Sequence, residues 1–139
     1  MKITNGLMKI LFEAINQPGF MDNANGPTGY ALYRNIRILS DELKDYDKVI
    51  DDALKKYGKK LDNGAYMIDK DDEKTIGKFY EAVIPVANLE VDVNLYQISK
   101  DDFDLPYCET ATPKQYAIIE EFLVKPDEEK EEDSVIIEG

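Results

Sequence analysis

The chain has 139 residues, of which 43% are hydrophobic, and its 29 acidic side chains outnumber its 17 basic ones, giving a net charge of −12. This length fits one domain, predicted over residues 1–124, followed by an acidic tail over residues 125–139. The lack of histidine and the single cysteine exclude zinc sites of the usual kinds and hydrolases that use a histidine base.

The first predicted elements are a strand over residues 2–4 and a helix that Asn5 caps. Residues 17–28 are rich in asparagine, glycine and proline, which predicts a long loop. We expect this loop to carry Phe20 and Met21 at an exposed tip. Because long ordered loops are often functional, both side chains are candidates for contact with a partner.

One continuous helix is predicted over residues 29–57. Its apolar side chains recur at alternating steps of four and three residues, a spacing typical of a coiled-coil seam. Such a stripe requires a partner helix along its length, and two partners stay open: the next helix of the chain, or a second copy in a homodimer. The stripe consists of Leu32, Ile36, Leu39, Leu43, Tyr46, Ile50, Ala53 and Tyr57.

The second half of the chain mixes both kinds of element. Residues 61–64 predict a turn, and residues 89–98 alternate between apolar and polar side chains, as in a half-buried antiparallel strand. Helices are predicted from Asp72 and from Thr112, which precedes a proline suited to the first helical position. Together these elements predict an α+β fold, with a small antiparallel sheet packed against helices and one long central helix.

Several patterns that would indicate metal binding or catalysis are incomplete in this sequence. Asp69 and Asp71 begin like a calcium loop, but Lys74 stands where the loop needs glycine and Tyr80 where it needs glutamate. Acidic pairs four residues apart on the long helix are interpreted as a solvated face. Cys108 is interpreted as a small buried or half-buried hydrophobic residue rather than a nucleophile. We therefore predict no catalytic residue, cofactor or metal site, and interpret the protein as non-enzymatic.

Residues 23–40 contain no acidic side chain, although the chain as a whole is strongly acidic. Tyrosine and arginine are enriched at protein interfaces, so the pairs of each that fall within two helical turns predict a contact with a protein partner. The alternative is an ordinary amphipathic helix in which Arg37 pairs with Asp41. The candidate residues are Tyr30, Tyr33, Arg34 and Arg37.

The acidic tail is the second candidate for partner binding. Its acidic side chains favour a basic protein surface over nucleic acid or anionic lipid, although negative charge also serves simple solubility. The apolar run that follows them is either a short motif adding a strand to a partner's sheet or a third strand of the chain's own sheet. The residues are Asp127, Glu128, Glu129, Glu131, Glu132 and Asp133, then Val135, Ile136 and Ile137.

Four short motifs spread over nearly the whole chain carry a resemblance. They are Lys2-Ile3-x-Asn5-Gly6-Leu7, Tyr33-Arg34-Asn35-Ile36 with Leu39-x-x-Glu42-Leu43, Glu90-Val91-Asp92-Val93, and Thr112-Pro113. The sequence thereby resembles a family of short, functionally uncharacterised proteins encoded by tailed phages and prophages of Gram-positive bacteria. The resemblance implies a phage or prophage setting, in which small acidic proteins frequently bind other proteins, and it brings no catalytic residues.

Two function classes follow from these observations. The first is an inhibitor or modulator whose acidic surface occupies the basic groove of a nucleic-acid-handling protein, such as a host defence nuclease. The second is a virion-assembly or chaperone role, in which the long seam and the loop at Phe20 pack into a phage structural protein or a symmetric oligomer. No apolar stretch reaches the roughly 18 residues that cross a bilayer, and no secretory signal is recognisable, so we expect the cytoplasm of a bacterial host cell.

Overall fold

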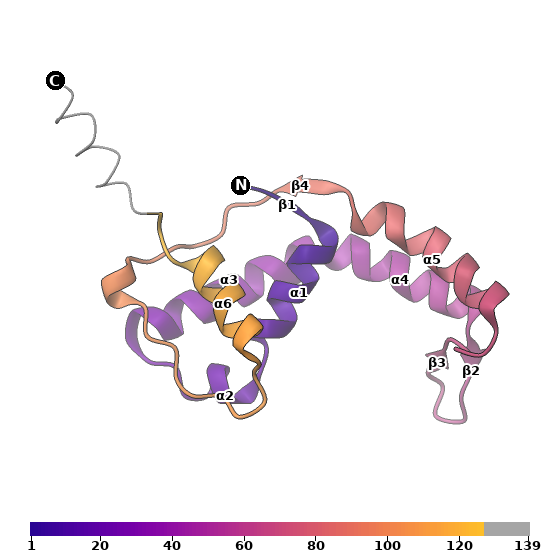
Figure 1. The fold of residues 1–139 in the computed structure, drawn as a ribbon, viewed down its shortest axis with the longest axis horizontal. Coiled ribbons are helices and arrows are strands. Elements are labelled where there is room, and N and C mark those ends of the chain that lie inside the picture. Colours follow the sequence, from indigo (N-terminus) through magenta and orange to yellow (C-terminus); the bar gives the residue numbers. More distant parts are fainter. Residues whose placement is uncertain (127–139) are drawn as a thin grey trace, which may run out of the picture. The chain divides into compact units, whose positions relative to one another are not determined.

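The structure is a computed structural model that describes residues 1–126. Within these residues lie six α-helices, one 3-10 turn and two separate two-stranded antiparallel sheets, which confirms the α+β class (Figure 1). The chain divides into two compact units, where a single domain was predicted. Unit 1 comprises Met1–Glu13 and Ile36–Asn94, and unit 2 comprises Ala14–Asn35 and Leu95–Gly139.

The first sheet and first helix of unit 1 begin at the N-terminus. Strand β1 (Lys2–Thr4) pairs antiparallel with β4 (Glu90–Asp92), with Ile3 opposite Val91. Helix α1 (Asn5–Ile15) follows β1 directly. It is capped by the Thr4 hydroxyl, which accepts a hydrogen bond from the Leu7 amide at 3.2 Å.

The predicted cap at Asn5 is therefore wrong by one residue. A cap lies just outside its helix so that its side chain reaches an amide three residues on, and Thr4 holds that place. The Asn5 side chain instead donates to the Val86 carbonyl at 2.9 Å, and its backbone amide donates to the Leu89 carbonyl at 3.0 Å. Asn5 thus links the start of α1 to the end of the helix that precedes β4.

The predicted long helix is two helices, α3 (Gly26–Glu42) and α4 (Lys44–Tyr57). They separate at Leu43, whose ψ of −5° departs from the helical value near −42°. The hydrogen-bond ladder continues through the break, because the Leu43 amide donates to Leu39 and the Asp47 amide donates to Leu43. The side-chain spacing is therefore preserved across it, which is why periodicity alone predicts one helix.

The apolar stripe of α4 is covered by α5 (Glu73–Ala87), which packs beside it (Figure 1). A hairpin joins the two helices, with β2 (Lys59–Lys60) paired antiparallel to β3 (Tyr66–Met67). Gly64 turns this hairpin with a φ of 86°, a left-handed conformation that glycine adopts without strain. The predicted turn is confirmed, and so is the interpretation that the next helix covers this part of the stripe.

Helix α5 begins next to Asp72, as predicted, and the Asp72 side chain caps it by accepting a hydrogen bond from the Thr75 amide. The helix continues through Pro85 to its end at Ala87. Tyr80 and Ile84, however, are about half exposed, and so is Leu89, which lies outside the three-residue strand β4 instead of opening a longer strand. The alternation that predicted a ten-residue strand is satisfied by extended backbone after β4, where Val93 and Ile98 are buried.

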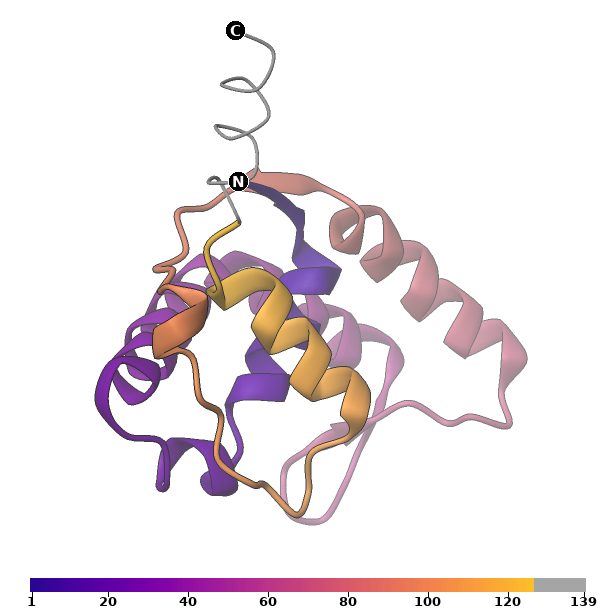
Figure 2. The same cartoon turned by 60° about the vertical axis from the view of Figure 1, so that its left-hand side comes forward.

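Unit 2 contains α2 (Pro18–Met21), the first part of α3, and α6 (Pro113–Leu123). The chain between β4 and α6 is mostly extended and contains one 3-10 turn, η1 (Lys100–Asp102) (Figure 2). Helix α6 starts with the predicted cap, because Thr112 and Gln115 each accept a hydrogen bond from the other's backbone amide. Ile119 and Leu123 of this helix are fully buried.

The predicted exposed tip at Phe20 is wrong. Residues 18–21 form α2, whose Phe20 side chain is fully buried, and Met21 is half-buried. The Phe20 ring packs edge-on against Tyr116 of α6, with ring centroids 5.1 Å apart. Burying the aromatic ring of Phe20 is more favourable in free energy than leaving it exposed in a polar loop. Residues 18–21 therefore form one helical turn that places the ring in the core.

Within residues 1–126 no helix is long and apolar enough to span a membrane.

Two glycine-to-alanine substitutions with opposite expected effects on stability test the packing around Gly19 in unit 2. A Cβ added to Gly19 would lie 2.7 Å from the Cys108 sulfur and 3.0 Å from its Cα, so Gly19→Ala should lower the free energy of unfolding by about 1 to 3 kcal/mol. A Cβ at Gly77, inside α5, would meet nothing within 4 Å, so Gly77→Ala should raise it by up to about 1 kcal/mol. Urea unfolding of both variants measures this, and equal effects would contradict the packing at Cys108.

The cap of α5 generates a pH dependence. The Thr75 hydroxyl and amide donate to Asp72 and lower the pKa of its carboxyl below the ordinary 3.8. Because the pKa is lower in the folded state, the stabilisation is present above about pH 4 and is lost as the pH falls further. Asp72→Asn should therefore cost stability at pH 6 and little at pH 2.5, measured by urea unfolding. Asp62→Asn, in the exposed hairpin turn, is the control, and a pH-independent cost at Asp72 would contradict the assignment.

Candidate functional site

The strongest candidate site is a surface group in unit 2, formed by the exposed Tyr30 and Arg34 and the half-buried Tyr96 and called here the Arg34 cluster. Arg34 Nη1 donates to the Tyr30 hydroxyl at 3.1 Å, and the guanidinium carbon lies 5.2 Å from the centroid of the Tyr96 ring. The two tyrosine rings meet edge to face, with centroids 5.2 Å apart and an interplanar angle of 79°. The arginine is thus held against two aromatic side chains by a hydrogen bond and a cation–π contact.

Helix α3 supplies two of the three side chains because Tyr30 and Arg34 lie four residues apart on one helical face. Tyr96 comes from the extended segment that follows β4. Its position is fixed by Asn35, a fully buried residue whose side-chain oxygen accepts from the Tyr96 amide at 2.7 Å. The Asn35 Nδ2 group donates to the Tyr96 carbonyl at 2.7 Å and to the Ala31 carbonyl at 2.8 Å.

The four predicted tyrosine and arginine residues lie on the surface, three of them in unit 2. Tyr30 and Tyr33 are 53% and 59% exposed, and Arg34 is exposed as well. Their contact with a protein partner stays a prediction. Arg37 is also exposed, but it belongs to unit 1, whose second segment begins at Ile36. Tyr96 was missed, because it lies 61 positions from Asn35 and no local pattern relates the two.

The remaining predicted partner-binding residues do not join this cluster. Phe20 is packed in the core of unit 2, and the next residue, Met21, is half-buried. The acidic and apolar tail residues lie outside the described part of the chain. They are Asp127, Glu128, Glu129, Glu131, Glu132, Asp133, Val135, Ile136 and Ile137.

The acidic side chains in and around α4 are largely compensated by lysines. Asp51 and Asp52 pair with Lys55 and Lys48 one helical turn away, at 2.9 and 3.3 Å. Asp47 pairs with Lys9 of α1 at 2.8 Å. These pairs agree with the interpretation of the acidic pairs as a solvated face.

Just before α4, Asp41 pairs with Lys44 at 2.8 Å. The hydrogen bond and the attraction between the two charges lower the pKa of Asp41 and raise that of Lys44. Both side chains are exposed, so this pair marks local charge balance rather than a reactive site.

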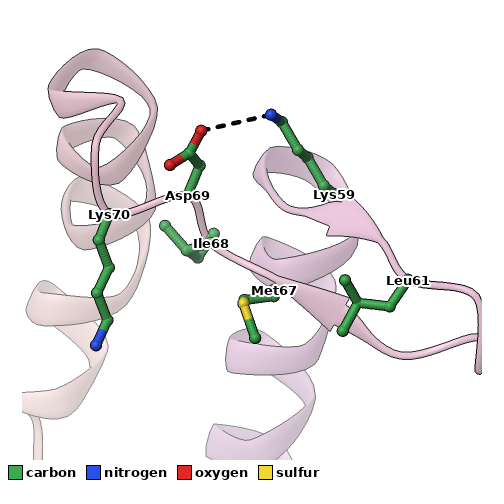
Figure 3. A pocket seen from close by; sticks show the side chains of 6 residues that line it. All are labelled: Lys59, Leu61, Met67, Ile68, Asp69 and Lys70. Carbon is green, nitrogen blue, oxygen red and sulfur yellow. Dashed lines mark hydrogen bonds and ion pairs between the residues drawn. The ribbon is translucent and has the colours of Figure 1, made fainter.

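The described residues also form two surface hollows. One, of about 330 Å³, is formed by the β2–β3 hairpin (Figure 3). Leu61, Met67 and Ile68 give it an apolar lining, and an ion pair of 3.4 Å between Lys59 and Asp69 lies to one side (Figure 3).

The second hollow, of about 390 Å³, lies between the start of α3 and the segment around η1. Asp101, Asp102 and Asp104 are among its lining residues. Their segment is held to α3 by Thr28, whose hydroxyl donates to the Asp102 carbonyl at 3.0 Å and accepts from the Asp104 amide at 2.8 Å.

Neither hollow presents a recognisable catalytic arrangement. Among residues 1–126, no group of three histidine, cysteine, aspartate or glutamate side chains is placed to hold a metal ion. Cys108 is buried, with 2% of its surface exposed, as its interpretation as a small hydrophobic residue requires. Asp69, the first residue of the rejected calcium loop, accepts a hydrogen bond from the Asp71 amide at 3.0 Å and so closes a turn.

Comparisons with known proteins add no assignment. No protein family model, no curated protein and no solved structure matches this chain. The resemblance to phage and prophage proteins therefore stays a prediction.

The support of Tyr96 by Asn35 can be tested directly. Asn35→Ala leaves the Tyr96 amide and carbonyl without their partners, which should lower the free energy of unfolding by on the order of 3 kcal/mol. It should also speed hydrogen exchange at the Tyr96 amide. Asn23→Ala is the matched control, because that exposed side chain donates a single bond to Gly19 and its loss should cost little. Unchanged exchange at Tyr96 in Asn35→Ala would contradict the assignment.

Proposed function

We propose that this protein is non-enzymatic and acts by binding another protein. We further propose that it is an acidic inhibitor or modulator that binds a basic surface of a nucleic-acid-handling protein of host defence. The observation that carries this proposal is the distribution of charge. Residues 127–139 contain seven acidic side chains and one lysine, so this short segment holds half of the net charge of −12.

The contrast with α4 makes this charge significant. There, acidic side chains alternate with lysines that pair with them, so their field is cancelled locally. Residues 127–133 offer only Lys130 for that purpose. A groove that binds phosphates would attract this segment by the same electrostatics.

The Arg34 cluster provides a second surface of the kind that partners use. Tyrosine and arginine side chains are enriched among the residues that contribute most to protein–protein affinity. Here Tyr30 and Arg34 are exposed, and the half-buried Tyr96 beneath them is fixed because its main chain is bonded to the buried Asn35. A pre-positioned surface loses less conformational entropy on binding than a mobile one.

The proposed setting is a phage or prophage product in the cytoplasm of a bacterial host cell. This rests on the resemblance of the four sequence motifs and on the acidic composition. It fits a protein whose partner handles nucleic acid, because host defence systems act on nucleic acid in that compartment. Direct binding of this acidic chain to nucleic acid or to an anionic membrane is disfavoured by charge repulsion.

No observation favours the alternative of a virion-assembly or chaperone role. It was predicted from two surfaces, the seam of the long helix and the loop at Phe20. The α4 part of the seam packs against α5, and Leu32, Leu39 and Leu43 are buried in the α3 part and at the break. Phe20 is buried against Tyr116. The same burial removes the argument for a homodimer through this helix.

The proposal is tested by capture from a bacterial lysate with the full-length chain. A variant in which all six acids of residues 127–133 are changed to their amides is the control. Wild type should retain a basic nucleic-acid-handling protein at low salt, and the variant should lose it at least tenfold. Retention should also fall sharply between low and physiological salt, because screening weakens contacts between exposed charges.

The captured protein is then purified and its binding to duplex DNA or RNA is measured with increasing amounts of this chain. Displacement of nucleic acid by wild type, but not by the amide variant, supports the proposal. Simultaneous binding of nucleic acid and wild-type chain would contradict it. Equal capture by wild type and variant would contradict the role of the acidic segment.

A further inference from the structure

The β2–β3 hairpin leaves main-chain groups of β3 without partners. The Leu61 amide donates to the Ala65 carbonyl at 2.7 Å, so the two strands are bonded to each other at this pair. In an antiparallel ladder, bonded pairs alternate with pairs whose N–H and C=O groups point outward. Tyr66 is therefore an outward position, and so is Ile68, two residues further on. With this register, neither main chain has a hydrogen-bond partner within residues 1–126.

The two edges of this hairpin differ in charge. Strand β2 consists of Lys59 and Lys60, and lysines on an edge strand oppose pairing with another strand. Residues 65–68 have the sequence Ala-Tyr-Met-Ile and carry no charge, although 33% of the residues in the chain are charged. An uncharged edge with free main-chain groups is what an added strand requires.

The apolar hollow of the hairpin provides a place for one side chain of such a strand (Figure 3). Side chains alternate between the two faces of a strand, so Met67 projects on the face opposite to Tyr66 and Ile68. Met67 and Leu61 both line the hollow, and they are 57% and 39% exposed. A residue of an added strand opposite Met67 would place its side chain on the same face. That residue is therefore expected to be apolar.

Lys70 gives the site its charge preference. It also lines the hollow, and its side chain points away from the ion pair of Lys59 and Asp69 (Figure 3). Within the part of the chain that the structure describes, Lys70 has no carboxylate partner. An acidic side chain on the added strand would supply one, because opposite charges attract over a few ångströms at a partly apolar surface.

We propose that the open edge of β3 binds an extended peptide segment of a partner protein, which pairs antiparallel with β3. The peptide main chain bonds to Tyr66 and Ile68, and an apolar side chain opposite Met67 enters the hollow. An acidic side chain three residues earlier in the peptide pairs with Lys70. The site lies in unit 1 and uses neither the acidic tail nor the Arg34 cluster. It goes beyond the proposed inhibitor role, and its failure would leave that role untouched.

The test titrates the full-length, ¹⁵N-labelled chain with the peptide Glu-Thr-Thr-Ile-Thr-Thr, acetylated and amidated at its ends. The amide signals of Tyr66 and Ile68 should shift and saturate in the millimolar range or below, and their hydrogen exchange should slow. The Lys60 amide, which points to the opposite edge, should stay unchanged. No saturable shift, or a shift at Lys60 in place of β3, would overturn the proposal.

Two methylated peptides test the strand pairing itself. A methyl group on the amide nitrogen of the fifth peptide residue removes the donor to the Tyr66 carbonyl, so affinity should fall by about tenfold or more. A methyl group on the nitrogen of the fourth residue, which points away from β3, is the matched control and should change affinity little. Equal affinities of the two methylated peptides would contradict the pairing.

A charge variant tests the role of Lys70. Lys70→Gln should weaken binding of the glutamate peptide several-fold, and it should leave binding of the same peptide with glutamine in place of glutamate unchanged. Lys74→Gln, an exposed position in the first turn of α5, is the control. Equal weakening of both peptides by Lys70→Gln would contradict the proposed ion pair.

Hydrogen exchange of the chain without peptide identifies other occupants of the edge. The Tyr66 and Ile68 amides should exchange rapidly, because neither has a partner within residues 1–126. Protection that increases with protein concentration would show that a second copy of the chain pairs with β3. Protection that is independent of concentration would show that the edge is covered within the same chain. Either result would overturn the proposal.

Discussion

The buried side chain of Asn35 fixes the part of the molecule that bears the candidate surface. An amide presents both donor and acceptor groups, and here they bond both main-chain groups of Tyr96 as a neighbouring strand would. The extended segment is thereby attached to α3 without a sheet of its own. Tyr96 is then positioned to hold Arg34, and Ile98 to anchor the last described residues. The Arg34 cluster therefore depends on the backbone that Asn35 holds in place.

Electrostatics divides the chain into compensated and uncompensated parts. Along α4 each lysine–aspartate pair is local and exposed, so these pairs contribute little to stability and little to the distant field. Residues 127–133 hold six acidic side chains and only one lysine, Lys130, so their charge is not balanced within the segment itself. The proposed partner would balance it with basic residues on its own surface.

Sequence reasoning succeeded where the signal is local. The cap at Thr112, the start of a helix at Asp72 and the turn over residues 61–64 are each encoded within four residues, and all three form. It failed where the structure depends on contacts between segments that are far apart in the sequence. Phe20 is buried because Tyr116 of α6 offers it a ring, and composition of a loop carries no such information. Tyr96 joins Arg34 only because Asn35 bonds its backbone. The break at Leu43 was not predicted, because the periodicity of apolar residues reports their spacing along the chain and not the backbone dihedral angles.

The two units are interleaved along the chain, and this has a consequence for synthesis. Residues 14–35 emerge from the ribosome early, but the segments that complete their unit begin only at Leu95. At about 5 to 20 residues per second, the buried faces of α2 and early α3 wait on the order of several seconds for α6. Unit 1 closes sooner, once Asn94 has been made. The nascent chain therefore passes through a stage in which unit 1 is complete while apolar side chains of residues 14–35 are still exposed to solvent. Chaperones that bind exposed apolar segments would act at this stage.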